Sequence, residues 1–219
     1  MAAVALGRDF VFKQTILETC PTGLTEIDAL AGGLPHGCLT EIYGPASSGR
    51  TSLMLAALAQ STRREDVCAL VDSSDAFDPA SAASAGVRLE RLLWVRCGGN
   101  AEHALKAADL LVQGGGFGMV VMDLADTPAI TARRISMTSW FRLRRAVEHT
   151  PTVLLVLEQQ PMAKTCASLT LEMRCEQAEW SGAPGCSRLG CSRLLRGIRA
   201  RAERRKPVPA RAAAFESRW

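Results

Sequence analysis

Short apolar runs alternate along the chain with longer stretches in which apolar residues recur every three or four positions. The apolar runs are residues 67–74, 92–97, 118–126 and 150–160. The stretches of helical period are residues 50–64, 100–116 and 131–149. A run that is apolar throughout is typical of a parallel strand buried on both faces of a sheet. Strands that alternate with helices therefore predict an α/β fold, a mostly parallel sheet flanked by helices on both faces.

Capping and turn residues predict the ends of several elements. Asn100 fits the N-cap of one helix, and Pro79 fits the first turn of a further helix. A strand is expected at residues 38–43, where it leads into a turn at Gly44. Residues 168–180 alternate in polarity, which predicts an edge strand of an antiparallel pair.

The same pattern divides the chain into one large unit and shorter flanking segments. The core is expected at residues 21–180, after a leader at residues 1–20. A loop or insertion is expected at residues 181–192, and residues 193–219 predict the last strand or strands with a basic C-terminal tail. A length of 219 residues suits one α/β domain with a substantial core.

Composition narrows the class of protein. Hydrophobic residues make up 47% of the chain, which favours a globular protein over a disordered one. No apolar run reaches the roughly 18 residues that span a bilayer, and the N-terminus lacks the pattern of a signal peptide. A cytoplasmic protein with reduced cysteines and no membrane contact is therefore expected.

The net charge of +4 is unevenly distributed. Residues 186–219 contain ten Lys or Arg and two Asp or Glu, so the rest of the chain is net acidic. A basic end is compatible with contacts to nucleic-acid phosphates, to an acidic protein surface or to solvent alone, and the sequence leaves these three open. The candidate DNA- or partner-binding residues are Arg199, Arg201, Arg204, Arg205, Lys206 and Trp219.

The sequence EIYGPASSGRTS at residues 41–52 has the outline of a phosphate-binding loop, Gly-x-x-x-x-Gly-Lys-Ser/Thr. In such a loop, between a strand and a helix, backbone N–H groups and the helix N-terminus converge on phosphate. Thr51 occupies the position whose hydroxyl binds Mg²⁺. The candidate nucleotide-binding residues of the loop are Gly44, Pro45, Ala46, Ser47, Ser48, Gly49, Arg50, Thr51 and Ser52.

Arg50 stands where the pattern has lysine. Lysine places a compact charge on the β- and γ-phosphates from inside the loop, whereas the planar guanidinium is bulkier and not equivalent in a tight cradle. Nucleotide binding is compatible with Arg50, but fast hydrolysis is not expected.

Around this loop the sequence resembles the RecA recombinase family. The resemblance begins with TGLTEIDALAGGLPHGCLTEIYGPASSGRTSL, continues through GMVVMDLAD and LLVLEQQ, and spans roughly residues 21–180. A fainter similarity covers residues 193–215. The resemblance implies a RecA-like P-loop NTPase core with C-terminal antiparallel strands, and ATP with Mg²⁺ as its ligands.

Position by position, the resemblance implies roles for three residues outside the loop. Asp78 would lie near the adenine, and Gln159 would sense the γ-phosphate. Asp123 would orient, through water, the Mg²⁺ that Thr51 binds.

Two side chains of the family pattern are replaced in this sequence. Ser74 stands where the family has the glutamate that activates water, and a serine is no general base at neutral pH. Ser81 stands where a tyrosine stacks on adenine. Asp75 is the one candidate for a substitute base, although successive side chains on an extended segment point opposite ways. Whether the chain is an enzyme is left open.

The family's two DNA-binding loops correspond here to short segments after Asp126 and Gln159, and its N-terminal polymerisation helix and C-terminal lid domain are short or missing. Strand exchange is therefore not expected. A short RecA-like chain with an altered ATP site and an arginine-rich end resembles the ImuA group, bacterial accessory proteins of SOS-linked translesion synthesis. That resemblance implies an ImuB-like, polymerase-related protein as partner, with other translesion factors, RecA, DNA or a second copy of the chain as further candidates.

Two other functions stay open at this point. One is a weakly active, ATP-dependent DNA-binding ATPase, in which Asp75 or a residue of a partner supplies the base. The other is a regulator that caps or disrupts RecA filaments. A nucleotide retained by the purified protein would favour the first, and co-purification with RecA would favour the second.

Overall fold

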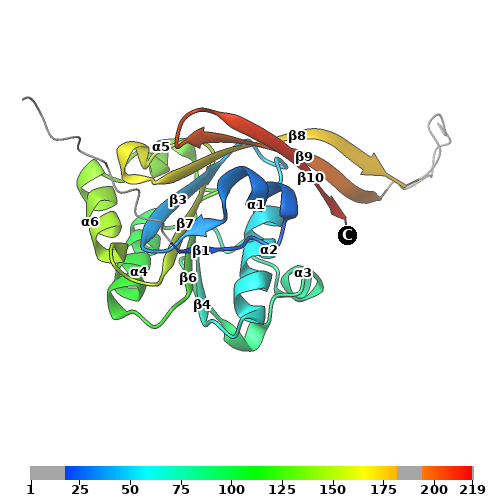
Figure 1. Cartoon of the computed structure of the whole chain (residues 1–219). Helices are drawn as coiled ribbons and strands as arrows, with labels where there is room; N and C mark the ends of the chain where they lie inside the picture. Colours follow the sequence, from blue (N-terminus) through cyan, green and yellow to red (C-terminus); the bar gives the residue numbers. More distant parts are fainter. Residues whose placement is uncertain (1–17, 182–193, 219) are drawn as a thin grey trace, which may run out of the picture.

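Eight strands form the central sheet of the computed structural model, which describes residues 18–181 and 194–218 (Figure 1). The strands of the chain are β1 (Thr19–Cys20), β2 (Leu34–Pro35), β3 (Cys38–Tyr43), β4 (Cys68–Asp72), β5 (Leu92–Arg96), β6 (Met119–Asp123), β7 (Val153–Glu158), β8 (Leu169–Trp180), β9 (Leu195–Lys206) and β10 (Arg211–Arg218). The helices are α1 (Thr25–Ala31), α2 (Arg50–Arg63), α3 (Pro79–Ser84), α4 (Ala101–Gly114), α5 (Ala129–Ala132) and α6 (Met137–Val147), with 3-10 turns η1 (Leu89–Arg91) and η2 (Lys164–Cys166).

The strand order of the sheet is β10-β9-β8-β3-β7-β6-β4-β5. The six strands from β8 to β5 in this order pair in parallel. The last two strands change direction, because β9 pairs antiparallel with both β8 and β10. The predicted fold class, a mostly parallel α/β sheet with helices on both faces and antiparallel C-terminal strands, is therefore confirmed.

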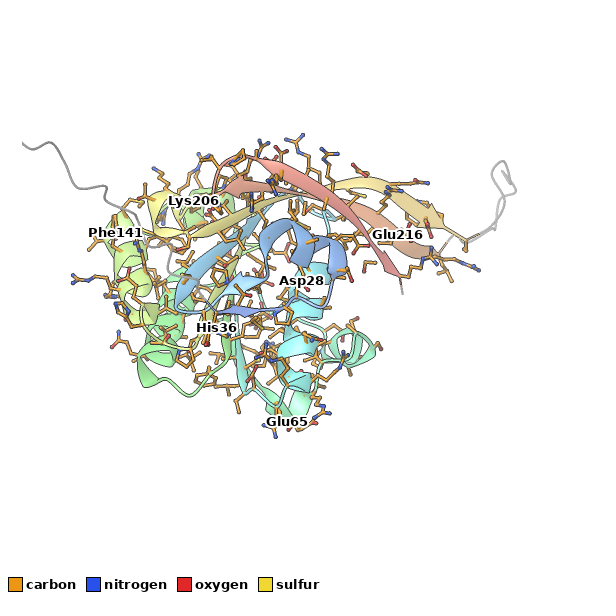
Figure 2. The ribbon with its side chains drawn as sticks, viewed as in Figure 1. Asp28, His36, Glu65, Phe141, Lys206 and Glu216 are labelled. Carbon is orange, nitrogen blue, oxygen red and sulfur yellow. The ribbon has the colours of Figure 1, made fainter. Side chains whose placement is uncertain are left out.

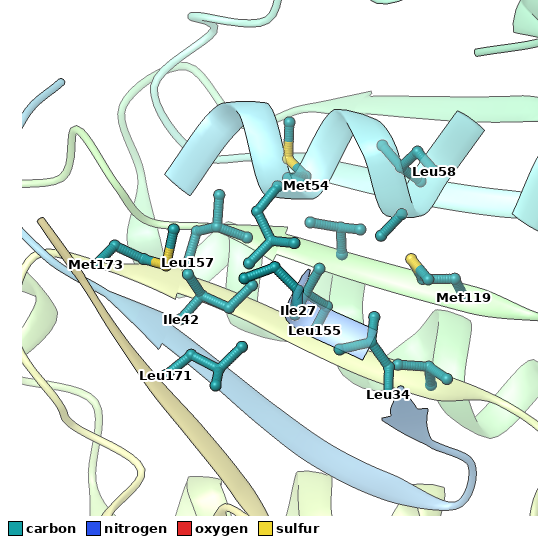
Figure 3. Packing of buried hydrophobic residues seen from close by; sticks show 14 of the residues in the cluster. Ile27, Leu34, Ile42, Met54, Leu58, Met119, Leu155, Leu157, Leu171 and Met173 are labelled. Carbon is teal, nitrogen blue, oxygen red and sulfur yellow. The ribbon is translucent and has the colours of Figure 1, made fainter. Parts of the chain in front are cut away.

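The two faces of the sheet bury separate apolar clusters. Leu155 of β7 faces the first cluster and its neighbour Leu154 faces the second, as the side-chain period of a strand requires. Helices α1, α2 and α3 cover the first face, where Met54 and Leu58 of α2 pack on the strands (Figure 3). Helices α4 and α6 cover the second face.

Local sequence determines the helix starts that were predicted. The Asn100 side-chain oxygen accepts hydrogen bonds from the backbone N–H groups of Glu102 and His103 at 2.9 and 3.1 Å, and so caps α4. Pro79 is the first residue of α3, directly after its N-cap Asp78. Each cap satisfies backbone donors that a helix leaves without a partner in its first turn.

Two predictions about individual elements are wrong. β8 is not an edge strand, because it lies between β3 and β9. Its alternation is misleading, since residues 174–180 are exposed whichever side of the strand they occupy. The helix expected at residues 131–149 is divided between α5 and α6, because Ser136 caps a new helix by accepting a hydrogen bond from the Ser139 N–H at 3.2 Å.

β8 and β9 extend past the parallel strands as a ribbon, and β10 accompanies β9 as far as Gly197 (Figure 1). One face of β9, together with the middle of β10, contributes Ile198, Ala200, Ala202 and Phe215 to the first apolar cluster. Most of the predicted leader, nearly all of the loop expected at residues 181–192, and Trp219 lie outside the described residues. In the described part of the chain, no helix has the length and apolar character needed to cross a membrane.

Candidate nucleotide site

The phosphate loop, residues 44–52, connects β3 to α2. Gly49 is the N-cap of α2 with φ +91°, a conformation that glycine adopts far more easily than other residues. Gly44 has no room for a side chain, because a Cβ there would lie 2.3 Å from the carbonyl oxygen of Met173 on β8. The backbone therefore requires both glycines of the motif.

The other side of the loop packs against the C-terminal strands. A Cβ on Gly49 would lie 2.8 Å from the Ala200 Cβ, 3.5 Å from the Phe215 Cζ and 3.6 Å from the Ile198 Cδ1. The loop is thus held between β8 on one side and β9 with β10 on the other. This neighbourhood was not evident from the sequence, because it depends on how the last strands return to the sheet.

A cavity of about 240 Å³ opens between the loop and β9, lined by residues 47–52, Leu195 and Ile198. The Ser48 Oγ is buried and has no hydrogen-bond partner within the described residues. Thr51 is exposed. A buried hydroxyl without a partner, in a glycine turn at a helix N-terminus, fits a phosphate-bearing ligand. These residues therefore fit the nucleotide that the motif predicts.

Arg50 is the first residue of α2 and is only 5% exposed. Its Nη1 donates a hydrogen bond to the carbonyl oxygen of Glu158 at 2.6 Å. Burial lowers the pKa of the guanidinium, while the carboxylates of Asp123 and Asp126 favour its charged form. One nitrogen of the guanidinium is therefore already bonded to a backbone carbonyl at the carboxyl end of β7.

Asp123 ends β6, and its Oδ1 accepts a hydrogen bond from the Ala125 N–H at 2.9 Å. Burial raises the pKa of the Asp123 carboxyl to about 6, and the neighbouring Asp72 raises it further, whereas Arg50 opposes the shift. Arg50 and Asp123 are therefore close enough to interact electrostatically. With a pKa of about 6, Asp123 is mostly ionised at neutral pH, as a carboxylate that orients Mg²⁺ must be.

A pair of buried carboxyl groups next to this site was missed in the sequence. Glu41 on β3 and Glu158 on β7 are each 1% exposed. The Met162 N–H donates to both, at 2.6 Å to the Glu41 Oε1 and 3.0 Å to the Glu158 Oε2. Burial, and then the adjacent Glu41, raise the pKa of Glu158 far above its ordinary value, so Glu158 holds a proton at neutral pH. The only signal in the sequence was a glutamate at the end of an otherwise apolar strand.

Asp72, the last residue of β4, organises the segment that follows it. Its carboxylate accepts hydrogen bonds from the backbone N–H groups of Ser74, Ala76 and Phe77, at 3.1, 3.3 and 2.9 Å. It also accepts one from the Trp94 Nε1 at 3.3 Å. The carboxylate of Asp72 is therefore a structural group that shapes the turn after the strand.

Ser74 occupies the place where the family pattern has its catalytic glutamate, and Asp75 is the next residue. The Asp75 carboxylate accepts hydrogen bonds from the Arg96 Nη2 at 3.0 Å and from the Gly98 N–H at 3.2 Å. Both of its oxygens thus have partners at the end of β5. The Ser74 Oγ lies 3.3 Å from the Ser73 Oγ, so the position itself carries a hydroxyl and no carboxylate.

Asp78 and Gln159 do not line the cavity at the phosphate loop. Asp78 caps α3, where its carboxylate accepts hydrogen bonds from the Ser81 hydroxyl and the Ser81 N–H, at 2.5 and 2.9 Å, which lower its pKa. The Gln159 Nε2 donates to the carbonyl oxygen of Ala125 at 3.0 Å. Gln159 thus connects the end of β7 to the segment after β6, close to Asp123 in the sequence.

Three of the arginines predicted to bind DNA or a partner form ion pairs within the sheet. Arg199 and Arg201 of β9 both pair with Glu176 of β8, each at 3.5 Å. Arg205 pairs with Glu172 of β8 at 2.7 Å. Much of the positive charge that the sequence shows in this region is therefore balanced by glutamates on β8.

The two remaining described residues of that predicted set bind backbone carbonyl groups. The Arg204 Nη2 donates to the Pro209 oxygen at 3.4 Å, and the Lys206 Nζ donates to the Thr165 oxygen at 3.3 Å. Figure 2 shows side chains with nitrogen and with oxygen ends along these strands, with Lys206 and Glu216 labelled. Trp219 lies outside the described residues.

A wider hollow, of about 750 Å³, lies between the start of α4 and the α5–α6 region. Lys106, Arg134, Arg142 and the acidic Glu102 are among its lining residues. Arg142 pairs with Asp109 at 3.3 Å, whereas no ion pair of Lys106 or Arg134 is found among the residues that the structure describes. Unlike Arg199 and Arg201 on β9, the cationic side chains of Lys106 and Arg134 therefore form no ion pair within the described residues, although Glu102 also lines the hollow.

Comparison with known proteins links the chain to one family. Residues 2–134 match the family model described as the RecA N-terminal domain. Protein RecA of Prochlorococcus marinus strain MIT 9303 is 46% identical over 118 residues, which are 53% of this chain and 30% of that protein. Protein RecA of Brucella anthropi is 41% identical over 119 residues, 53% of this chain and 32% of that protein. The chain thus spans about a third of the length of these curated relatives.

Proposed function

The chain belongs to the RecA family, and on that premise we propose that it is an accessory protein of bacterial DNA repair that acts by binding rather than by catalysis. Within the family, we propose an ImuA-type role in SOS-linked translesion synthesis. An ImuB-like, polymerase-related protein is its proposed partner. DNA, RecA and further copies of the chain are proposed as additional partners.

The observation that carries this proposal is a phosphate loop with intact backbone geometry beside an incomplete set of catalytic groups. Gly44 and Gly49 support the loop conformation. The position of the catalytic glutamate holds Ser74, whose hydroxyl does not accept a proton from water at neutral pH. The neighbouring Asp75 is engaged at the end of β5, where Arg96 donates to it. This combination supports a nucleotide that is bound but not turned over.

ATP with Mg²⁺ is the proposed ligand of the loop. Backbone N–H groups of the loop and the Ser48 hydroxyl would hold phosphate, and Thr51 and Asp123 would hold Mg²⁺, Asp123 through water. Bound there, Mg²⁺ would neutralise part of the phosphate charge. The buried charge of Arg50, fixed at the end of β7 by its 2.6 Å hydrogen bond, would add a further attraction for phosphate.

Calorimetric titration of Mg-ATP, combined with an assay for released phosphate, tests the proposed ligand. We expect saturable binding to the full chain, weakened by about tenfold or more in Arg50→Ala because one charge-assisted contact is removed. Arg63→Ala, in the last turn of the same helix, is the matched control and should bind like the wild type. We expect no phosphate release above that of the Arg50→Ala protein.

Three outcomes would change this proposal. Absence of binding at millimolar ATP would remove the nucleotide and leave a scaffold that acts through partners alone. Sustained phosphate release that Asp75→Asn abolishes would favour the ATPase alternative. Size-exclusion chromatography with a purified ImuB-like protein and with RecA would then compare the partners, since stable binding to RecA alone would favour the filament regulator.

A further inference from the structure

A bulge in the ribbon turns an apolar side chain toward the phosphate loop. The pairing of β8 with β9 skips Arg196, because Gly197 and Leu195 pair with successive residues of β8. An extra residue of this kind changes the face on which the next side chain lies. Leu195 consequently shares a face with Ile198, and both line the cavity at the loop.

Trp180 lies beside Leu195 on that face. The two residues are direct cross-strand partners in the antiparallel pair, and such partners project to the same side of a sheet. Trp180 is 50% exposed and Leu195 is 41% exposed. Leu195 lines the cavity at the phosphate loop, and the half-exposed indole of Trp180 lies beside Leu195, just outside that lining.

The cavity has two chemically different walls. One wall is the loop, with its backbone N–H groups and hydroxyls, and the other is formed by Leu195 and Ile198. Its volume of about 240 Å³ is below the roughly 300 Å³ at which sites for small molecules usually begin. The cavity therefore encloses only part of a ligand. A nucleoside phosphate suits this shape, with its phosphates in the loop and its ribose and base leaving along the apolar wall.

We propose that Trp180 and Leu195 form the base-binding wall of the nucleotide site, in the role of the aromatic residue that Ser81 replaces. The indole face offers a stacking surface for a purine, and Leu195 and Ile198 cover the apolar edge of the ribose. This inference rests on the proposed nucleotide binding. It goes beyond that proposal by naming the residues that favour a nucleoside triphosphate over bare triphosphate.

Two ligands test the phosphate loop and the base-binding wall separately. Inorganic triphosphate can contact only the loop, whereas ATP also reaches Trp180 and Leu195. Each would be titrated with Mg²⁺ into the full chain and into Leu195→Ala and Trp180→Ala. We expect both substitutions to weaken ATP binding by about five- to tenfold, because Trp180→Ala removes a base-stacking contact and Leu195→Ala removes an apolar contact to the ribose. We expect triphosphate binding to change by less than about twofold, because the loop is untouched.

Leu194→Ala is the matched control. Leu194 directly precedes Leu195 and is 69% exposed, and consecutive side chains of an extended segment project to opposite sides, so this variant should bind both ligands like the wild type. All three substituted side chains are at least 41% exposed, and their melting temperatures should therefore stay within about 2 °C of the wild type.

Tryptophan fluorescence gives an independent readout. ATP should change the emission of the wild type and not that of Trp180→Phe, whereas triphosphate should change neither. One outcome would contradict the base-binding wall but support the phosphate loop. In that outcome triphosphate binds, and ATP binds equally tightly to the wild type, to Leu195→Ala and to Trp180→Ala. If neither ligand binds the wild type, the proposed nucleotide site itself fails, and the wall fails with it.

Discussion

Glu158 illustrates how burial changes the charge of a single side chain. Its carboxyl ends a strand whose other residues are apolar, and Glu41 competes with it for the same N–H group of Met162. Two adjacent carboxyl groups in apolar surroundings do not both ionise, because each charge raises the free energy of the other. The backbone carbonyl of the same residue accepts the hydrogen bond from Arg50, so the end of β7 also contacts the phosphate loop.

Glu158→Gln should remove a pH dependence of stability. The folded pKa lies above the ordinary value of 4.5, so the folded chain keeps a proton that the unfolded chain releases. In the wild type, the free energy of unfolding should fall by up to about 1.4 kcal/mol per pH unit above the unfolded pKa from this group alone. Urea unfolding between pH 5 and 9 measures the slope. Glu90→Gln, at an exposed glutamate, is the control, and equal slopes in the two variants would contradict a retained proton.

Gly49→Ala should destabilise the folded chain. The residue has φ +91°, and a Cβ there would lie 2.8 Å from the Ala200 Cβ, so we expect a loss of about 2 kcal/mol or more in the free energy of unfolding. Gly114→Ala, in α4, is the control because nothing lies within 4 Å of its Cβ position. Chemical denaturation compares the two. A loss below about 1 kcal/mol at Gly49 would mean that β9 does not hold the loop.

At the scale of elements, the sequence predicted those helices and strands whose positions depend on local residue patterns. β6 and β7 were predictable because burial on both faces makes them apolar throughout, and α4 because Asn100 caps it. The position of β8 was not predictable, because exposure of its far half on both faces imitates an edge strand. The phosphate loop follows from its motif, whereas the Leu195 wall depends on strand order and on a bulge. The hydrophobic periodicity of the sequence predicts neither the strand order nor the bulge.

Basic side chains lie in two places, the hollow beside α4 and the strand β9. Arg199 and Arg201 of β9 form ion pairs with Glu176, whereas the cations of the hollow, Lys106 and Arg134, form none within the described residues. We therefore expect DNA to bind at the hollow. Lys106→Glu with Arg134→Glu, in the hollow beside α4, should weaken binding of a single-stranded oligonucleotide by about tenfold and reduce its salt dependence by about one to two phosphate contacts. Fluorescence anisotropy at several salt concentrations measures both quantities.

Arg199→Glu with Arg201→Glu is the matched pair on β9. Both arginines already share Glu176, so we expect this pair to weaken binding by less than about threefold. A larger loss for the β9 pair than for the α4 pair would place the DNA on the ribbon instead.

At the scale of the whole molecule, the last strands complete the core. Residues 2–134 match the RecA N-terminal domain, but the first apolar cluster also contains Ile198, Ala200 and Phe215 from the far end of the chain. Helix α1 lies against β10 as well as β9. The family-matched region and the C-terminal strands therefore share one core and should unfold together.

Phe215→Ala should destabilise the entire sheet. Phe215 is 2% exposed, so its removal should cost about 3–5 kcal/mol in the free energy of unfolding. Phe141→Ala is the matched control, because the same side chain on α6 is 45% exposed and should cost less than about 1 kcal/mol. Urea unfolding followed by circular dichroism measures both. Similar small losses would show that β10 adds little to the core.

The contact between Gly49 and Ala200 also limits how such sequences can diverge. The methyl group at position 200 occupies the space that a side chain at position 49 would need. A larger residue at position 49 is tolerated only with a smaller residue at position 200, and the reverse also holds. The two positions should therefore covary among descendants of this chain. Selection for a stable sheet alone is then enough to preserve a glycine at position 49. Survival of the phosphate-loop motif in a lineage is therefore not by itself a record of catalysis.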